Sequence, residues 1–413
     1  RFGNFGAVGL GWIISEEPFM KPLNKVLSFA KISGNYGTNG SDGVAPYKYQ
    51  PFWKVGSTTS TQTFDGTRPY TANNLYNPDY SWASKRSINL GLDLGFIDDK
   101  ILMNLAYYRA RTGNQLTGYT LPTQVGFSNV VMNMDATLQN SGLELSITTR
   151  TITRKDFKWV TSFNISGNRN KLISFPGLAT SAYSATYAIG KSTSMIYGFK
   201  YAGINDTTGV FQYYKANGTI TSAPMTSNIA KGGDMQPIAN AQTDFYGGLN
   251  NNFTYKNWSL SVLFKFSRAM AKNYLAGLSY ASPLPGGQVN LPSFMEGMFW
   301  TKPGDNAKLM RLTTGYYGAA RNGQLAQRYG SYFTSSDAVY SNNTYLRLKS
   351  LMLAYSLPEK TVKKMGIQSC AFNINAQNLF TITNYKFGDP EMPGMLYTVP
   401  MQLIITGGFN LEF

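Results

Sequence analysis

The sequence predicts an all-β protein, a transmembrane antiparallel β-barrel. Three observations support this fold class. Apolar and polar residues alternate in about eleven segments, most of them near the roughly 9–11 residues with which a tilted strand crosses a bilayer. The connectors between these segments alternate strictly between short and long. Charged residues make up only 14% of the 413 residues, well below the roughly 25% of ordinary globular domains, while aromatic residues also reach 14%.

The clearest alternation lies in SINLGLDLGF, residues 87–96. Five large apolar residues share one face of this extended segment: Ile88, Leu90, Leu92, Leu94 and Phe96. The other face carries small and polar residues, among them Asn89 and Asp93. The polar turn IDDK joins this segment to a second one, 101–108, so we expect the two to form a hairpin.

The same period of two recurs along the chain. We place the remaining strands at 5–14, 26–36, 138–149, 157–166, 244–255, 258–267, 345–356, 369–379 and 399–413. Strands of soluble sandwiches are shorter, typically about 5–6 residues. The segment lengths therefore favour strands that span a membrane.

The connectors are sorted by length. The short ones are 15–25, 97–100, 150–156, 256–257 and 357–368, and the long ones are 37–80, 111–137, 167–243, 268–344 and 380–398. Outer-membrane barrels have short periplasmic turns and long outer loops. The sorting therefore predicts a multi-pass barrel in the outer membrane whose C-terminus lies in the periplasm.

Aromatic residues gather where strands meet the short connectors: Trp12, Phe157, Trp159, Tyr255 and Trp258. Such rings are enriched at the headgroup level of membranes. The alternative interpretation is a soluble β-sandwich, in which the same rings pack in the core between two sheets.

The chain ends with TGGFNLEF, residues 406–413. Phe409, Leu411 and Phe413 share one face of an extended strand, and a hydrocarbon solvent explains large apolar side chains at this position. The ending also resembles the C-terminal signal by which outer-membrane barrels reach the assembly machinery. The matching positions are Gly408, Leu411 and Phe413.

The composition excludes much enzyme chemistry. There is no histidine and a single cysteine, Cys370, so neither a Ser-His-Asp nor a Cys-His arrangement can form. The segment GLSYA, 277–281, lacks the last glycine of a nucleophile elbow. AIGKST, 188–193, lacks the first glycine of a phosphate-binding loop, and no helical pattern follows it. We predict no enzyme activity, no catalytic residue, no cofactor and no resident metal.

The charged residues permit two further interpretations, nucleic-acid binding and a calcium site. The formal net charge of +16 permits nucleic-acid binding, but the basic residues are scattered, which favours a solvated surface or contact with anionic lipid headgroups. Asp389 and Glu391, in GDPEMPG, can supply oxygen ligands for calcium. A solvated, proline-containing turn is the interpretation that we prefer for this segment.

No window of 18 apolar residues occurs, so no transmembrane helix is predicted. The chain begins with Arg1 and shows no signal peptide. We interpret it as a mature fragment, or as the ordered part of a longer protein.

Several motifs occur in an order that carries a family resemblance. They are VGLGWIISEEPFM (8–20), AKISGNYGTNG (30–40), NLGLDLGFIDDKI (89–101), LPTQVGFSNVVMN (121–133), LQNSGLEL (138–145), IYGFKYAGI (196–204), NTYLRLKSLMLAYSLPE (343–359), NAQNLFTITNYKFGDPE (375–391) and the terminal FNLEF. Over residues 1–413 the chain resembles the C-terminal barrel portion of SusC/RagA-type TonB-dependent outer-membrane transporters. Residues 205–343 match this pattern least, and substrate or partner specificity is expected there.

The resemblance implies a plugged barrel of about 22 strands, of which this chain supplies roughly the C-terminal half. The plug domain, the TonB-interacting segment and the first strands are then absent from these residues. Open edges are not compatible with lipid, so we expect that further residues precede Arg1 or that another chain pairs with both edges.

The resemblance also implies active import of a large nutrient, a glycan or a peptide. The expected partners are a SusD-like surface lipoprotein, TonB through the missing N-terminal region, outer-membrane lipid and the barrel assembly machinery, with a homodimer of transporter–lipoprotein pairs left open. Loop aromatics are expected either to stack on sugar rings or to pack the loops together: Trp53, Tyr70, Tyr76 and Tyr80. The alternative function is a non-importing barrel that serves as a structural platform in an envelope assembly.

Overall fold

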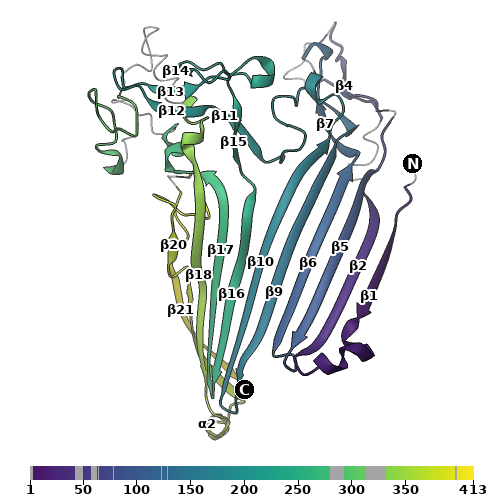
Figure 1. Ribbon diagram of the computed structural model, residues 1–413, viewed down its shortest axis with the longest axis vertical. Coiled ribbons are helices and arrows are strands. Elements are labelled where there is room, and N and C mark those ends of the chain that lie inside the picture. Colours follow the sequence, from purple (N-terminus) through teal and green to yellow (C-terminus); the bar gives the residue numbers. More distant parts are fainter. Residues whose placement is uncertain are drawn as a thin grey trace.

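The computed structural model describes residues 3–41, 50–56, 63, 65–77, 79–121, 123–127, 129–279, 293–312, 332–395 and 398–413. Its dominant feature is one large antiparallel sheet. Figure 1 shows the strands side by side as a wall, with the long connections gathered at the upper end and the short turns and the C-terminus at the lower end.

Eleven strands of this sheet follow one another in chain order, each hydrogen-bonded to its neighbours. They are β1 (Gly6–Ile13), β2 (Leu27–Ser41), β5 (Ala83–Phe96), β6 (Ile101–Gly113), β9 (Thr137–Thr153), β10 (Phe157–Ser174), β16 (Thr243–Tyr255), β17 (Trp258–Lys272), β18 (Tyr340–Ser356), β19 (Ser369–Gln377) and β21 (Ile404–Glu412). A short twelfth strand, β20 (Thr381–Thr383), pairs with the upper part of β18. Each predicted segment overlaps one of the eleven strands, which confirms the all-β fold class. The predicted start of the last strand is wrong, because β21 begins at Ile404 and not at residue 399.

The predicted sorting of connectors is also confirmed. The lower turns hold only short helices: η1 (Ile14–Glu16), η2 (Pro18–Leu23) and α2 (Glu359–Lys364). The upper connections hold small sheets, formed by β3 (Phe52–Val55) with β4 (Tyr70–Asn74), β7 (Gln115–Thr120) with β8 (Asn129–Met134), β11 (Met195–Gly198) with β15 (Gln236–Asn240), and β12 (Lys200–Ile204) with β13 (Phe211–Tyr214) and β14 (Ile220–Thr221). They also hold the 3-10 turns η3 (Thr123–Val125), η4 (Leu178–Thr180), η5 (Ile229–Lys231), η6 (Tyr274–Ser279), η7 (Ser293–Met295) and η9 (Asp337–Val339).

Several strands continue further toward the long connections than the alternation predicts. β10 reaches Ser174 instead of 166, and β18 begins at Tyr340 instead of 345. The added part of β10 contains Asn168, Arg169, Asn170 and Lys171, which are polar on both faces. Backbone pairing does not require apolar side chains, so the ladder continues after the sequence signal has ended.

The register lines up apolar residues across the wall. Leu92 lies opposite Ile32 of β2 and Leu105 of β6. The row continues through neighbouring strands as Trp12, Ile32, Leu92, Leu105, Leu145 and Ile165. The next row, on the opposite face, is polar: Asp93, Asn104, Ser146 and Asn164. The sheet therefore has one apolar face and one polar face.

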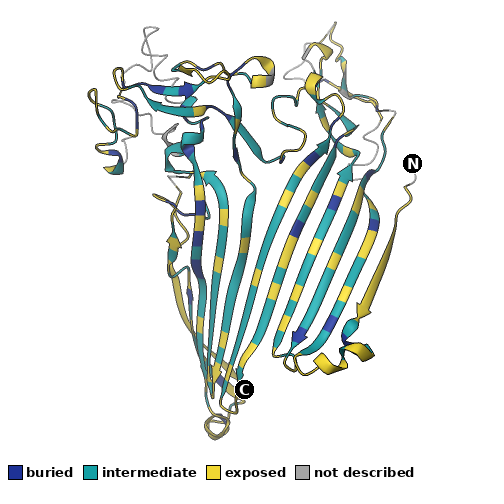
Figure 2. Ribbon diagram, viewed as in Figure 1, coloured by how far each residue is buried: buried dark blue, intermediate teal, exposed yellow. Residues whose placement is uncertain are grey.

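The apolar face is accessible in the described structure. Leu10 is 81% exposed, Leu143 53% and Leu90 52%, and Figure 2 shows half-buried and exposed residues along most of the wall. The total accessible surface is 25411 Å², whereas a compact monomer of this mass exposes about 16,000 Å². The interpretation as a sandwich, with these leucines between two sheets, is therefore wrong. Such a face needs an apolar solvent outside the chain.

Within the described residues, β1 and β21 form the two edges of the sheet, each paired on one side. The helices of that part of the chain are too short or too polar to cross a membrane, a finding that does not address strands.

The assignment of the two faces can be tested at Asn89 and Leu92, which lie on opposite faces of β5. Leu92→Asp places a charge on the apolar face and should lower the free energy of unfolding in lipid vesicles by up to about 2 kcal/mol, with a size that depends on depth. The matched variant Asn89→Asp places the same charge on the polar face and should have a smaller effect. Urea unfolding of both variants in vesicles measures the difference, and a larger loss for Asn89→Asp would show that the faces are reversed.

Candidate functional site

The polar face of the wall carries a buried ion-pair network. The segment after β20 folds over β17 and β18 and brings Asp389 and Glu391 to Arg347, whose side chain is 3% exposed. Arg347 Nη2 lies 2.6 Å from Asp389 Oδ1, and Arg347 Nη1 lies 3.3 Å from Glu391 Oε2, an ion-pair distance without hydrogen-bond geometry. Lys265 Nζ lies 2.9 Å from Glu391 Oε1, and Lys349 Nζ lies 3.6 Å from Glu391 Oε2.

The network keeps both carboxylates ionised. Burial alone would raise the pKa of Asp389, but hydrogen bonds from the backbone N–H of Glu391 and from Arg347 outweigh it and lower the pKa. Burial would likewise raise the pKa of Glu391, and the hydrogen bond and charge of Lys265 lower it instead. Because the folded pKa values are depressed, the stabilisation is present above the ordinary carboxyl pKa of about 4 and is lost as the pH falls through the folded values.

These contacts correct the sequence-based interpretation of GDPEMPG. The segment is not a solvated turn, since the side chains of Asp389 and Glu391 are 4% and 8% exposed. The oxygen atoms available for calcium are instead paired with ammonium and guanidinium groups. Among the described residues no group of ligands suited to a metal ion was found.

Further hydrogen bonds hold the whole segment, residues 384–395, which we call the inward loop. The Tyr385 hydroxyl donates to the carbonyl oxygen of Lys272 at 3.0 Å and accepts from the Gly394 N–H at 2.7 Å. The Asn343 side-chain amide donates to the Pro390 carbonyl oxygen at 2.6 Å. The inward loop is thus attached to the polar face at several separate points.

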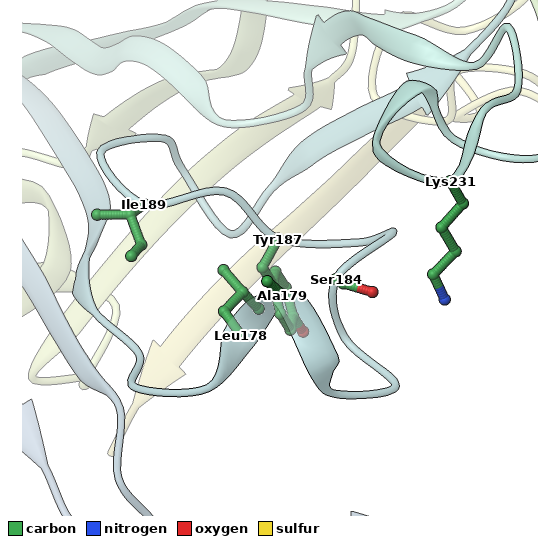
Figure 3. Close-up of a pocket in the computed structure, with 6 residues that line it drawn as sticks. All are labelled: Leu178, Ala179, Ser184, Tyr187, Ile189 and Lys231. Atoms are coloured by element: carbon green, nitrogen blue, oxygen red, sulfur yellow. The ribbon is translucent and has the colours of Figure 1, made fainter.

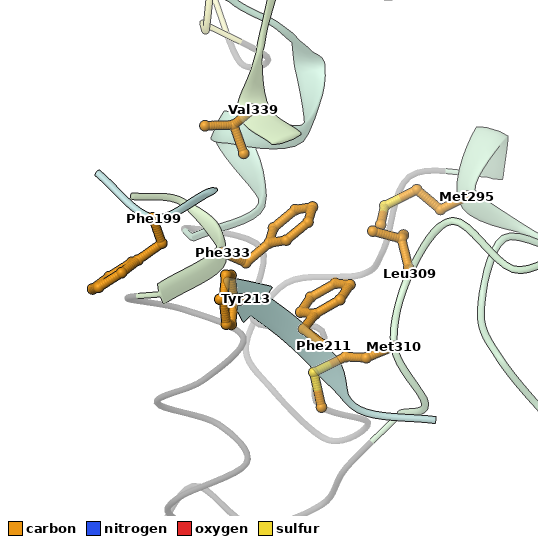
Figure 4. Packing of buried hydrophobic residues seen from close by; sticks show 8 residues of the cluster. All are labelled: Phe199, Phe211, Tyr213, Met295, Leu309, Met310, Phe333 and Val339. Carbon is orange, nitrogen blue, oxygen red and sulfur yellow. The ribbon is translucent and has the colours of Figure 1, made fainter. Parts of the chain in front are cut away.

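The upper connections form a second packed unit, which we call the outer cluster. Its fully or nearly fully buried residues come from the β10–β16 and β17–β18 connections: Phe199, Phe211, Tyr213, Met295, Leu309, Met310, Phe333 and Val339. Figure 4 shows the rings of Phe211 and Phe333 facing each other, with centroids 4.1 Å apart. The Tyr201 N–H donates to the Asp337 carboxylate at 2.7 Å, which ties the same two connections together. The described part of 205–343 therefore contributes to a core of its own above the wall.

A cavity of about 330 Å³ opens beside the outer end of β10. Its lining is mainly apolar, with two residues that carry hydroxyl groups and one cation: Leu178, Ala179, Ser184, Tyr187, Ile189 and Lys231. Figure 3 shows Lys231 entering from a different segment than the other five residues. The volume lies at the small end of the roughly 300–1,000 Å³ that ligand sites occupy.

The four loop aromatics occupy different environments. Trp53 and Tyr70 lie on the paired strands β3 and β4 and are 65% and 70% exposed, and Tyr76 is 60% exposed. Tyr80 is half-buried and makes contacts within the chain. The first three rings are therefore accessible to an external ligand. The half-burial of Tyr80 favours a role in packing the loops.

At the lower end, the register brings aromatic rings into one continuous row across six strands: Phe157, Tyr255, Trp258, Tyr355, Phe372 and Phe409. The rings of Trp258 and Tyr355 lie 4.6 Å apart. Three of the five predicted rings, Phe157, Tyr255 and Trp258, belong to this row, and Trp159 lies two residues above Phe157 on β10. Trp12, near the end of β1, lies outside the row and packs against Phe19 of η2. The other three members become visible only through strand pairing.

The C-terminal residues lie at one edge of the wall. Gly408 is opposite Asn373 and Leu411 is opposite Cys370 in the β19–β21 pair. Phe413 is 82% exposed. This placement leaves all three residues accessible, and their role as an assembly signal remains a prediction.

The structure describes only one of the two rejected motifs, AIGKST and GLSYA, in full. AIGKST leads into β11 and not into a helix, so the geometry of a phosphate-binding loop is not formed. In GLSYA, Tyr280 and Ala281 lie outside the described residues.

The ion-pair network can be tested against an exposed pair of the same chain. Arg347→Met removes the guanidinium partner of the buried Asp389 carboxylate and one of the cations beside Glu391, and should lower the free energy of unfolding by about 3–5 kcal/mol. Glu359→Gln breaks the exposed Glu359–Lys363 pair of α2, which should change it by less than about 0.5 kcal/mol. Urea unfolding, with limited proteolysis of the inward loop, measures both. Equal effects would mean that the network does not hold the loop.

No family model matches the chain. Curated relatives are TonB-dependent receptor P3 and TonB-dependent receptor P39 of Formosa agariphila, 27% and 26% identical over 95% and 100% of the chain. TonB-dependent receptor SusC of Bacteroides thetaiotaomicron is 27% identical over 100% of it. The chain spans 38%, 43% and 40% of these proteins, respectively.

Solved structures also match the chain over nearly its whole length. The RagAB peptide transporter matches with a TM-score of 0.80 and 23% identity over 100% of the chain and 44% of the matched one. The RagAB peptide importer in the "open-open" state matches with a TM-score of 0.78 over 99% and 42%. These proteins are named as receptors and transporters, not as enzymes. The resemblance to SusC/RagA-type TonB-dependent receptors is thus confirmed along the whole chain, which has the fold of part of a chain in the RagAB transporter.

Proposed function

We propose that the protein containing this chain imports a large nutrient across a Gram-negative outer membrane, in a TonB-dependent manner. The observation that carries the proposal is the wall itself, whose apolar face is accessible and whose polar face bears the inward loop. A wall of this kind separates hydrocarbon from an aqueous lumen. The similarity to TonB-dependent receptors supports energised import in preference to passive diffusion.

The cargo belongs to the glycan or peptide class. One polar-face row contains the hydrogen-bonding side chains Asn104, Ser146 and Asn164. Charged residues continue the row on both sides, Asp93 on β5 and Lys265 on β17. The amides and hydroxyls of this row donate and accept hydrogen bonds, as the hydroxyls of a glycan or the amides of a peptide require. RagAB is described as a peptide importer, which supports the peptide alternative.

The outer cluster provides the surface toward the cell exterior, and a SusD-like surface lipoprotein is its proposed partner. Its buried core fixes the relative positions of two long connections. Because these two connections are already fixed, they lose little conformational entropy when a partner binds to them. The short turns and the C-terminus then face the periplasm, and TonB acts through a region outside this chain.

Uptake by native cells tests the proposal. Deleting the gene in its host should abolish uptake of fluorescently labelled oligosaccharides or oligopeptides, and a plasmid copy should restore it. Inactivating TonB in the complemented strain should abolish uptake again. Uptake that persists without the gene, with a loss of co-purifying envelope proteins instead, would favour the structural platform over the importer.

The proposed assembly signal has a separate readout. Deleting Phe413 should reduce the amount of folded barrel in the outer membrane, because the terminal ring is the most exposed part of the signal. Phe413→Tyr keeps an aromatic ring and serves as the control. Heat-modifiable mobility of membrane fractions measures assembly, and uptake per assembled barrel should not change. Normal insertion of the deletion variant would contradict the signal.

A further inference from the structure

Basic side chains gather on the apolar face at the upper ends of the strands. Their alternation places them on the same face as the aliphatic residues below: Arg86, Arg109, Arg111, Arg169, Lys171 and Arg268. No register shift interrupts the β5–β6 pair, so Arg86 shares its face with Leu90 and Leu92. We call this set the outer basic belt.

The register brings the members of the belt together. Arg86 lies directly opposite Arg111, and Arg111 and Lys171 lie opposite the same residue of β9, Gln139. In the row below, Arg109 and Arg169 both lie opposite Ser141. Five members of the belt therefore lie in adjoining rows on β5, β6 and β10, linked in register through β9, and Arg268 lies farther along the wall on β17.

Among the described residues, one acidic side chain forms ion pairs with members of the belt. Asp244 lies 3.4 Å from Arg268 and 3.9 Å from Arg169. In the part of the chain that the structure describes, Arg86, Arg109 and Lys171 are in no ion pair. Like charges directly opposite each other destabilise a sheet. Arg111 donates a hydrogen bond to the neutral side-chain oxygen of Gln139 at 3.0 Å, which leaves its charge uncompensated. An anion bound at the Arg86–Arg111 pair would relieve this repulsion.

The height of the belt matches a membrane. Along β10, Phe157 of the lower aromatic row and Arg169 of the belt are separated by twelve residues. At about 3.3 Å per residue and a tilt of about 40°, this separation corresponds to about 30 Å along the barrel axis, the thickness of a hydrocarbon core. The half-exposed ring of Tyr107 lies two residues below Arg109 on β6, and the half-exposed ring of Tyr36 on β2 lies in register with Arg109 through Ile88. Tyrosine is enriched at that level of membranes.

We propose that the outer basic belt binds the phosphate groups of lipid headgroups in the outer leaflet. Guanidinium groups bind phosphate in a bidentate manner, and five of the six members are arginines. The belt lies on the apolar face directly above the aliphatic residues, so the acyl chains of the same lipid can cover those residues. This inference rests on the membrane placement in the proposed function.

The experiment uses the intact protein in phosphatidylcholine nanodiscs that contain a minor fraction of bis-phosphorylated lipid A. The belt variant carries R86Q, R109Q, R111Q, R169Q and K171Q. The control variant carries the same change of charge at the lower end: K100Q, R150Q, R154Q, K155Q and K158Q. Native mass spectrometry measures the retained lipid A, and heat-modifiable mobility confirms that each barrel is folded.

Wild type and control should retain lipid A above its bulk fraction, and the belt variant should retain about tenfold less. Dephosphorylated lipid A should not be enriched, and inorganic phosphate should not displace the bound lipid. Unchanged retention by the belt variant, equal loss in the control, or displacement by inorganic phosphate would overturn the inference while leaving import untouched. A wild-type protein that does not enter nanodiscs would overturn both this inference and the proposed function.

Discussion

The structure depends on the coupling between backbone pairing and side-chain direction in an antiparallel sheet. Successive residues point to opposite faces, so a slip of one residue in any pair would turn every leucine of that strand to the polar side. Across the wall, the pairings keep Ile32, Leu92 and Leu105 in one row and Asp93 and Asn104 in the next. The wall can therefore separate two solvents only because each register agrees with its neighbours.

Two departures from regular pairing place charged side chains beside their ion-pair partners. In β18 an extra residue, Lys349, separates the pairing partners of Leu263 and Phe264. This bulge allows Lys349 to reach Glu391 on the polar face without reversing the leucines beyond it. In β16, Asp244 occupies a similar bulge, from which its carboxylate reaches Arg268.

The wall was predictable from the sequence because a lipid-facing strand repeats a simple pattern over ten or more residues. The upper strand ends were not, since around Arg169 both faces are polar and the pattern disappears. The partners in the ion-pair network, Arg347 and Asp389, are 42 positions apart, so a local window shows only a polar turn. The Phe211–Phe333 stack joins two connections with no periodicity at all. Such contacts are consequences of the fold and leave no local signal.

The order of the strands has a consequence for biogenesis. Among the eleven main strands of the wall, each strand after β1 pairs with the main strand before it, and none inserts between two others that precede it. The tightest link is the two-residue turn at Lys256 and Asn257, where Lys256 adopts a positive φ of 50° and closes the hairpin directly. A growing wall can thus add one hairpin at a time at one edge, while the β1 edge stays unchanged. At every stage the unpaired backbone groups are confined to these two edges, where a folding catalyst in the membrane can shield them until the next hairpin arrives.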